Sequence, residues 1–122
     1  MPAYEGRCHC DTVRFTVALE PTRLIDCNCS ICTKKGVLHI PVQDTELTVH
    51  AGEAELALYQ FGTDTARHWF CRRCGIHVFG RPRTAPHRYC VNARCLDDFH
   101  SRFKHLPMVS FDGIHHPADD AC

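Results

Sequence analysis

Seven of the ten cysteines lie in three short groups whose spacing is suited to binding metal ions. The groups are Cys8-His9-Cys10, Cys27-Asn28-Cys29-Ser30-Ile31-Cys32 and Cys71-Arg72-Arg73-Cys74-Gly75. Thiolate sulfur is a preferred ligand of Zn²⁺, and cysteines a few residues apart commonly hold it. The sequence therefore predicts bound zinc and leaves open how the sulfurs are divided between ions.

Four of these cysteines predict a closed structural site. On an extended segment Cys8 and Cys10 would project from the same side, because strand side chains repeat every two residues. Cys71 and Cys74 have the spacing of a zinc knuckle, in which Gly75 lets the backbone fold back so that amides face the sulfurs. Four thiolates around one ion leave no vacancy for a substrate, so this zinc would tie the N-terminus to the middle of the chain.

The remaining group, Cys27, Cys29 and Cys32, predicts a second zinc with an open position, which is the mark of a catalytic metal. Three thiolates give such an ion a net negative formal charge, so it is a weaker electrophile than a zinc held by neutral histidines. It is better suited to binding another thiol and keeping it deprotonated than to activating water.

Spacing alone allows two other arrangements. Cys27 and Cys29 could share an ion with Cys71 and Cys74. Alternatively, a histidine could complete the three-cysteine loop and make it structural only; the candidates are His39, His68 and His77. A histidine on a strand is more often a surface or core residue than a ligand.

Three cysteines lie outside these groups. We expect Cys90 and Cys95 to fill core space as small hydrophobic residues. Cys122 is expected to lie in a loosely held tail.

A stretch rich in arginine, residues 65–96, contains no acidic residue. Its arginines are Arg67, Arg72, Arg73, Arg81, Arg83, Arg88 and Arg94. They could compensate the negative charge of a zinc tetrathiolate and otherwise face water, or they could form a pocket for the carboxylates of an anion such as glutathione. A formal charge of zero over the chain argues against a nucleic-acid partner.

Short β-strands must position these groups. Residues 12–19 alternate between apolar and polar side chains, which predicts a half-buried strand. Runs rich in β-branched and aromatic residues predict further strands over 37–42, 46–50, 55–61, 67–70, 76–80, 88–92 and 108–111. Only 30–35 and 96–103 are suited to a helical turn or two. The predicted fold class is mainly β.

The length of 122 residues fits one domain. No stretch approaches the roughly 18 uninterrupted apolar residues of a membrane span, and the first residues contain no apolar run of signal-peptide length. We therefore expect a cytoplasmic protein with no membrane partner. In a reducing compartment, ten cysteines indicate metal binding or thiol chemistry rather than disulfides.

The order of the motifs resembles the glutathione-dependent formaldehyde-activating enzyme family, which also includes centromere protein V. The resemblance is carried by Gly6-Arg7-Cys8-His9-Cys10 leading into Val13-Arg14-Phe15, by the two other cysteine groups, and by Val91-Asn92-Ala93-Arg94-Cys95-Leu96-Asp97. It covers about residues 4–112, which we take as the zinc-binding domain, with 113–122 as the loosely held tail. Asp11 stands where the family usually has glycine, and the chain is short at its C-terminal end.

The resemblance implies a single domain of coiled antiparallel sheets stapled by zinc, similar to the Mss-four-like architecture. By correspondence of motifs, one zinc would be structural and a second would serve the site associated with glutathione. The structural ligands would be Cys8, Cys10, Cys71 and Cys74, and the catalytic group would be Cys27, Cys29 and Cys32. The implied activity is a carbon-sulfur lyase reaction that joins glutathione and formaldehyde as S-hydroxymethylglutathione.

Two other functions fit the same residues. A zinc and glutathione carrier would bind a small thiol at the three-cysteine loop without turnover of an aldehyde. A chromatin-associated or nucleic-acid-associated zinc protein is suggested by the arginine-rich stretch and by one branch of the family, and it would show salt-dependent retention on DNA.

Overall fold

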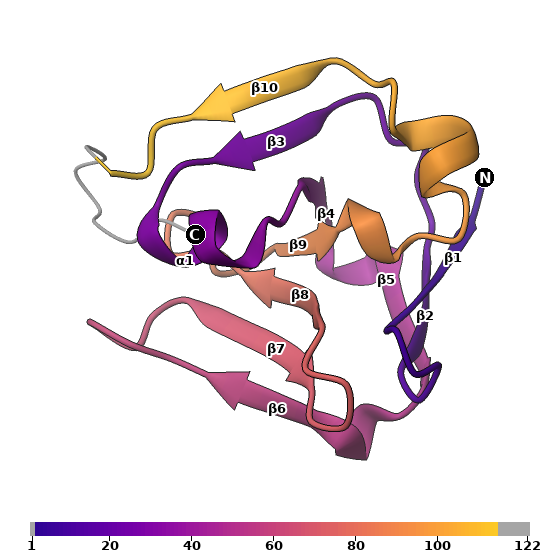
Figure 1. The fold of residues 1–122 in the computed structure, drawn as a ribbon, viewed down its shortest axis with the longest axis horizontal. Coiled ribbons are helices and arrows are strands. Elements are labelled where there is room, and N and C mark those ends of the chain that lie inside the picture. The colour runs from indigo at the N-terminus through magenta and orange to yellow at the C-terminus, as the bar shows by residue number, and fades with distance from the viewer. Residues whose placement is uncertain (1, 115–122) are drawn as a thin grey trace.

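Two β-sheets set at an angle to each other form most of the fold, and the computed structural model describes residues 2–114 (Figure 1). The smaller sheet has three antiparallel strands in the order β1-β2-β5, formed by β1 (Tyr4–Arg7), β2 (Arg14–Val17) and β5 (Leu47–Ala51). The larger sheet has seven strands in the order β10-β3-β4-β9-β8-β7-β6. Its strands are β3 (Leu24–Cys27), β4 (His39–Val42), β6 (Leu56–Tyr59), β7 (Arg67–Cys71), β8 (His77–Arg81), β9 (Tyr89–Asn92) and β10 (Met108–Phe111).

Helices are few and short. The single α-helix in the described chain is α1 (Ser30–Lys35), which ends at Gly36 in the left-handed conformation. Single 3-10 turns span Asp44–Glu46, Glu53–Glu55 and Ala93–Cys95, and a five-residue π-helical turn spans Phe99–Phe103. None of the helices in residues 2–114 has the length and apolar character needed to cross a membrane.

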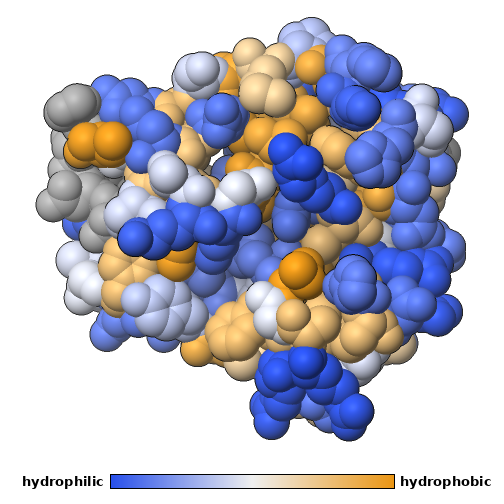
Figure 2. Space-filling view, viewed as in Figure 1, coloured by the Kyte–Doolittle hydropathy of each residue, from blue (hydrophilic) through white to orange (hydrophobic). Residues whose placement is uncertain are grey.

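The core lies where the two sheets meet. Phe15 and Val17 of β2 are buried against residues of the large sheet, among them Val78 and Phe79 of β8 and Val91 of β9. The rings of Phe15 and Phe79 meet edge to face with centroids 6.2 Å apart. The face in Figure 2 is mostly hydrophilic, with small, separated hydrophobic patches. The alternation that predicts a half-buried β2 matches its burial, since Phe15 and Val17 are buried whereas Arg14 is exposed.

The mainly β, single-domain fold is confirmed, and all eight predicted strands are present within a few residues of their expected limits. Two strands were not predicted. The charged side chains and Gly6 in β1 hide its pattern, and the four residues of β3 are too few to show one. The strand pairs are antiparallel, as expected, with one exception at an edge of the large sheet, where β3 pairs with β10 in parallel.

Candidate metal centres

Four cysteine sulfurs converge where the small sheet meets the β7–β8 turn. The Sγ atoms of Cys8, Cys10, Cys71 and Cys74 all lie within 4.8 Å of one another. Cys10 Sγ lies 3.7 Å from both Cys8 Sγ and Cys71 Sγ. A tetrahedral zinc with Zn–S bonds of about 2.3 Å has sulfurs about 3.8 Å apart. The sulfur geometry fits a zinc ion, and the alternative pairing of Cys27 and Cys29 with Cys71 and Cys74 does not match the structure.

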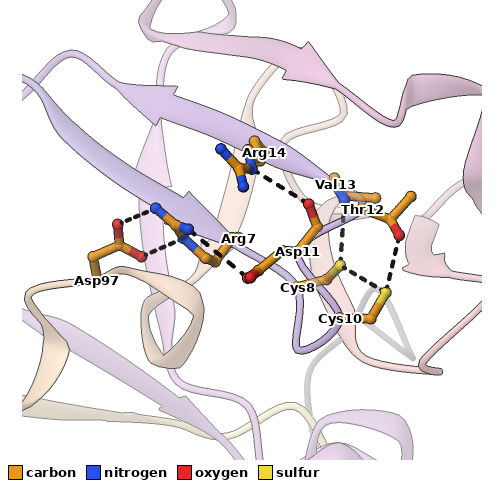
Figure 3. Close-up of polar contacts among 8 residues, drawn as sticks. All are labelled: Arg7, Cys8, Cys10, Asp11, Thr12, Val13, Arg14 and Asp97. Carbon is orange, nitrogen blue, oxygen red and sulfur yellow. Dashed lines mark hydrogen bonds and ion pairs between the residues drawn. The ribbon is translucent and has the colours of Figure 1, made fainter.

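Cys8 and Cys10 meet on a turn and not on the extended segment that the sequence predicted (Figure 3). The turn joins β1 to β2, and the backbone N–H of Cys8 donates to the carbonyl of Val13 (3.1 Å). The N–H of Val13 in turn donates to Cys8 Sγ (3.3 Å). The two sulfurs face the same side because the chain reverses at Asp11, whose φ is +66°.

An ion pair fixes the start of this turn. The guanidinium of Arg7 donates to both carboxylate oxygens of Asp97, at 3.0 and 2.9 Å (Figure 3). This bidentate geometry is directional as well as attractive. Asp97 follows the Ala93–Cys95 turn, so the contact ties the cysteine turn to a segment 90 residues further along the chain.

The left-handed conformation of Asp11 gives a stability prediction. The left-handed conformation costs a residue with a Cβ atom about 1–2 kcal/mol, whereas it costs glycine almost nothing. We expect Asp11→Ala to be less stable than Asp11→Gly by about 1 kcal/mol, since both variants lose the same exposed ion pair with Arg7. Chemical denaturation of the zinc-loaded variants measures the difference, and equal stabilities would contradict the prediction.

The second pair of sulfurs lies on a knuckle between β7 and β8. Cys71 ends β7, and its N–H donates to the carbonyl of Ile76 (3.0 Å). Gly75 has φ +78° and donates its N–H to the carbonyl of Cys71 (2.7 Å), as the predicted fold-back requires. Burial opposes the thiolate form of Cys74, but hydrogen bonds from the backbone amides of Ile76 and Cys10 and from the thiols of Cys71 and Cys8 together lower its pKa.

The protonation state of the four-cysteine cluster favours binding of a cation. Burial raises the pKa of Cys8 to about 11, whereas hydrogen bonds from the side chain and backbone of Thr12 lower the pKa of Cys10 to about 6. At neutral pH the ion-free cluster therefore holds both thiolate and thiol. A divalent cation would displace the remaining protons and bring the sulfurs into full ligation.

The second cysteine cluster is formed by Cys27, Cys29 and Cys32, whose sulfurs lie within 4.8 Å of one another. Cys27 ends β3, Cys29 precedes α1 and Cys32 lies inside α1, so a strand end and one helical turn bring the sulfurs together. All three residues are at most 3% exposed. In the described chain the cluster has three members, whereas zinc takes four ligands.

A segment after β10 packs against Cys27 and Cys29. Asn28 Oδ1 accepts hydrogen bonds from the N–H groups of Gly113 (2.7 Å) and Ile114 (3.0 Å), and Asn28 Nδ2 donates to Asp112 (3.1 Å). Gly113 is buried and lies so close that a Cβ atom there would be 2.8 Å from Cys27 Sγ. The sequence assigned no role to Asn28 or Gly113. Residues 115–122, which include Cys122, lie outside the described residues.

The three candidate histidines are buried near the three-cysteine cluster but differ in their contacts. His39 Nε2 lies 3.1 Å from Cys32 Sγ. His68 and His77 instead face Lys35, whose Nζ lies 3.2 and 2.9 Å from their respective Nδ1 atoms. None of the three belongs to the group of mutually close ligand atoms within residues 2–114. The three histidines lie near the three-cysteine cluster and do not complete its set of metal ligands.

Burial of these imidazoles predicts loss of stability in acid. Burial, reinforced by the charge of Lys35, lowers the pKa of His39 and of His68 to about 4. The unfolded chain binds these protons from about pH 6.5 downwards, so unfolding takes up protons between pH 6.5 and 4 and stability falls as pH falls. His68→Gln should reduce this slope by up to about 1.4 kcal/mol per pH unit. Denaturation with excess zinc at several pH values measures the slope, and the exposed His105→Gln should leave it unchanged.

Three arginines of the acid-free stretch form ion pairs with carboxylates that lie outside it. Arg72 and Arg73 each lie 3.6 Å from the carboxylate of Glu55. Arg81 donates to Asp44 (2.6 Å) and lies over the ring of Tyr89. These contacts neutralise part of the stretch locally. Arg88 lies elsewhere, in the wall of a cavity that also contains Arg23 and His39.

Cys95 fills core space as the sequence predicted, whereas Cys90 lies in the walls of two cavities and not in the core. Neither belongs to a cluster, and burial raises the pKa of each to about 12, so both are protonated at neutral pH. Cys95 is buried in the main core and Cys90 is partly buried.

Comparisons with known proteins identify the family of the chain. The chain is 36% identical to a Rhodobacter sphaeroides protein of known crystal structure, with a TM-score of 0.76 over 86% of this chain and 99% of that one. It is also 23% identical over 116 residues to a Schizosaccharomyces pombe protein named an uncharacterized lyase, covering 92% of this chain and 77% of the relative. Residues 3–109 match the profile of the glutathione-dependent formaldehyde-activating enzymes. The chain therefore belongs to the glutathione-dependent formaldehyde-activating enzyme family.

Proposed function

We propose that the protein is a zinc-dependent carbon-sulfur lyase that joins glutathione and formaldehyde as S-hydroxymethylglutathione, or acts on a related thiol adduct. The observation that carries the proposal is the cluster of Cys27, Cys29 and Cys32, which offers three sulfurs to an ion that takes four ligands. Membership of the family and the lyase name of the fission-yeast relative support the reaction class. The four-cysteine cluster would hold a second, structural zinc.

A cavity of about 210 Å³ is the best candidate for the glutathione site. It borders the three-cysteine cluster, because His39 contacts Cys32 and Phe111 packs against the cluster. Arg23 and Arg88 lie in the same wall, and two guanidinium groups suit the two carboxylates of glutathione. A larger cavity of about 510 Å³ is lined by His68 and His77 but by no arginine, and none of the three cysteines lines either cavity.

In the proposed reaction the chain's own residues bind and orient the thiol. Arg23 and Arg88 would hold the carboxylates, and Phe111 would limit access of water to the sulfur. Zinc, when bound by the three cysteines, would keep the incoming thiol deprotonated at neutral pH. The glutathione sulfur then forms a bond to the formaldehyde carbon, and the carbonyl oxygen takes up the proton that the thiol lost. Holding both reactants together supplies an orientation advantage over the spontaneous addition.

Exchange kinetics test the proposal directly. Zinc-loaded protein mixed with glutathione and formaldehyde should interconvert the free and adduct forms faster than the spontaneous rate, and Cys29→Ser should abolish the excess. An unchanged rate in the native protein would overturn catalysis. Calorimetric binding of glutathione without acceleration would instead support a non-catalytic thiol-binding module.

The two arginines provide a second, finer test. Arg88→Ala should weaken glutathione binding by about tenfold, since a charge-assisted hydrogen bond contributes roughly 1.5–3 kcal/mol before screening at this partly open cavity. Arg14→Ala, which removes an exposed arginine from the small sheet, is the matched control. Equal affinities of the two variants, measured by calorimetry, would place the carboxylates elsewhere.

A further inference from the structure

A small cavity lies among the three buried histidines. Its volume is about 20 Å³, and its walls are His39, His68, His77, Gly80, Pro82 and Cys90. The three histidines are 6%, 3% and 7% exposed, respectively. One ring nitrogen of each is buried without a hydrogen-bond partner among the described residues: His39 Nδ1, His68 Nε2 and His77 Nε2. Leaving three such groups unsatisfied would cost several kcal/mol, since each costs about 1–3 kcal/mol.

Lys35 determines which nitrogen of two histidines carries the proton. An ammonium group donates hydrogen bonds and accepts none, so Nδ1 of His68 and Nδ1 of His77 must both accept from Lys35 Nζ. Burial keeps both rings neutral, because the pKa of His68 falls to about 4 and that of His77 falls well below its usual range. In a neutral ring the proton then lies on the other nitrogen. His68 and His77 therefore present Nε2–H donors to the cavity.

His39 presents a hydrogen-bond acceptor to the cavity and not a donor. This step rests on the proposed zinc site. A metal-bound Cys32 is a thiolate, which accepts a hydrogen bond from His39 Nε2–H across the observed 3.1 Å. The remaining nitrogen, Nδ1, then carries a lone pair. The cavity is thus faced by two donors and one acceptor.

Water is the ligand that matches this set. A water molecule can accept from both Nε2–H groups and donate to His39 Nδ1, giving the three hydrogen bonds typical of buried water. The volume is sufficient, because one buried water needs roughly 10–15 Å³ by the same measure. A cation does not match the cavity, because it needs lone pairs and His68 and His77 present N–H groups. An anion does not match it either, because it would face the lone pair of His39.

We propose that this cavity binds one ordered water molecule, which links Lys35, through His68 and His77, to His39 and the sulfur of Cys32. Lys35 is then a positioning residue for the three-cysteine cluster. It sets the two tautomers that hold the water, the water orients His39, and His39 donates to the sulfur. Such outer contacts commonly change metal affinity by about 10–100-fold when they are removed.

Nitrogen NMR of the histidine rings in the zinc-loaded protein tests the network without reference to activity. We expect His39, His68 and His77 all to be neutral Nε2–H tautomers. A high-resolution crystal structure should show one water bonded to the three nitrogens. A metal ion or an empty cavity at that point, or an Nδ1–H form of His68 or His77, would overturn the proposal. An Nδ1–H form of His39 alone would break the proposed link from the water to Cys32, and it would also contradict the thiolate state of Cys32 on which the proposed zinc site depends.

Variants of two adjacent lysines separate positioning from general destabilisation. Lys35→Met retains an apolar stem but removes the ammonium, so His68 and His77 should populate both tautomers and Zn²⁺ affinity at the three-cysteine cluster should fall by about tenfold in competition with a chromophoric chelator. Lys35→Arg, which keeps donors at the same position, should retain the Nε2–H tautomers. Lys34→Met is the matched control, because Lys34 lines the same cavity of about 510 Å³ as Lys35, whereas the hydrogen bonds to His68 and His77 come from Lys35. Unchanged tautomers in Lys35→Met, or equal affinity losses in both Met variants, would overturn the role of Lys35.

Discussion

Replacing Cys71 with alanine is expected to unfold most of the domain and to release the zinc of the four-cysteine cluster. Cys71 is fully buried, and its sulfur lies 3.7 Å from that of Cys10, so the change removes a ligand from the centre of the cluster. Structural zinc contributes about 10 kcal/mol or more to the folding of small zinc domains, whereas a whole domain is stable by about 5–15 kcal/mol. Losing even half of that contribution would remove most of the free energy of unfolding of the domain.

Cys95→Ala is the control for this prediction, because Cys95 is also a buried cysteine but belongs to neither cluster. Its loss should cost about 1 kcal/mol for a small cavity and leave the metal content unchanged. Elemental analysis and thermal unfolding of both variants give the comparison. If Cys71→Ala bound as much zinc and melted at the same temperature as Cys95→Ala, the four-cysteine site would not be structural.

The sequence was most informative where a local pattern determines the structure. Alternation of apolar residues located β2, and the spacing of Cys71, Cys74 and Gly75 predicted the knuckle, because both depend on neighbouring residues only. The grouping of Cys8 and Cys10 with the knuckle came from counting ligands, and the four sulfurs do lie together. Their local conformation was predicted wrongly, because a turn and a strand both bring alternate residues to one side.

The parts that could not be predicted depend on contacts between distant residues. β3 becomes a strand because β10 pairs with it in parallel, across more than eighty residues of sequence. The contact of Lys35 with His68 and His77 likewise arises only when α1 packs beside β7 and β8. The glycine expected at position 11 was the one available signal of a turn, since the structure places Asp11 at φ +66°, a conformation that glycine adopts without strain.

Substituting Gly113 with alanine should open the three-cysteine cluster. Gly113 packs there for lack of a side chain, because a Cβ atom would lie 2.7 Å from Cys29 Cβ and 2.8 Å from Cys27 Sγ. The cysteines are held by β3 and α1, whereas the segment after β10 is held mainly by the hydrogen bonds to Asn28. The segment should therefore move. Losing two hydrogen bonds of about 1 kcal/mol each should speed withdrawal of zinc from this cluster by a chelator by up to about 30-fold.

Gly36→Ala separates this effect from backbone strain. Gly36 ends α1 with φ +64°, but a Cβ atom there would meet nothing within 4 Å, so the substitution strains the helix end without crowding a sulfur. We expect its zinc-withdrawal rate to stay near that of the native protein, and Asn28→Ala to match Gly113→Ala because it releases the same segment. Equal rates in Gly113→Ala and the native protein would mean that ions and thiols reach the cluster by another path. An increase of tenfold or more would identify residues 112–114 as a cover that limits access to the three-cysteine cluster, whose members are all buried.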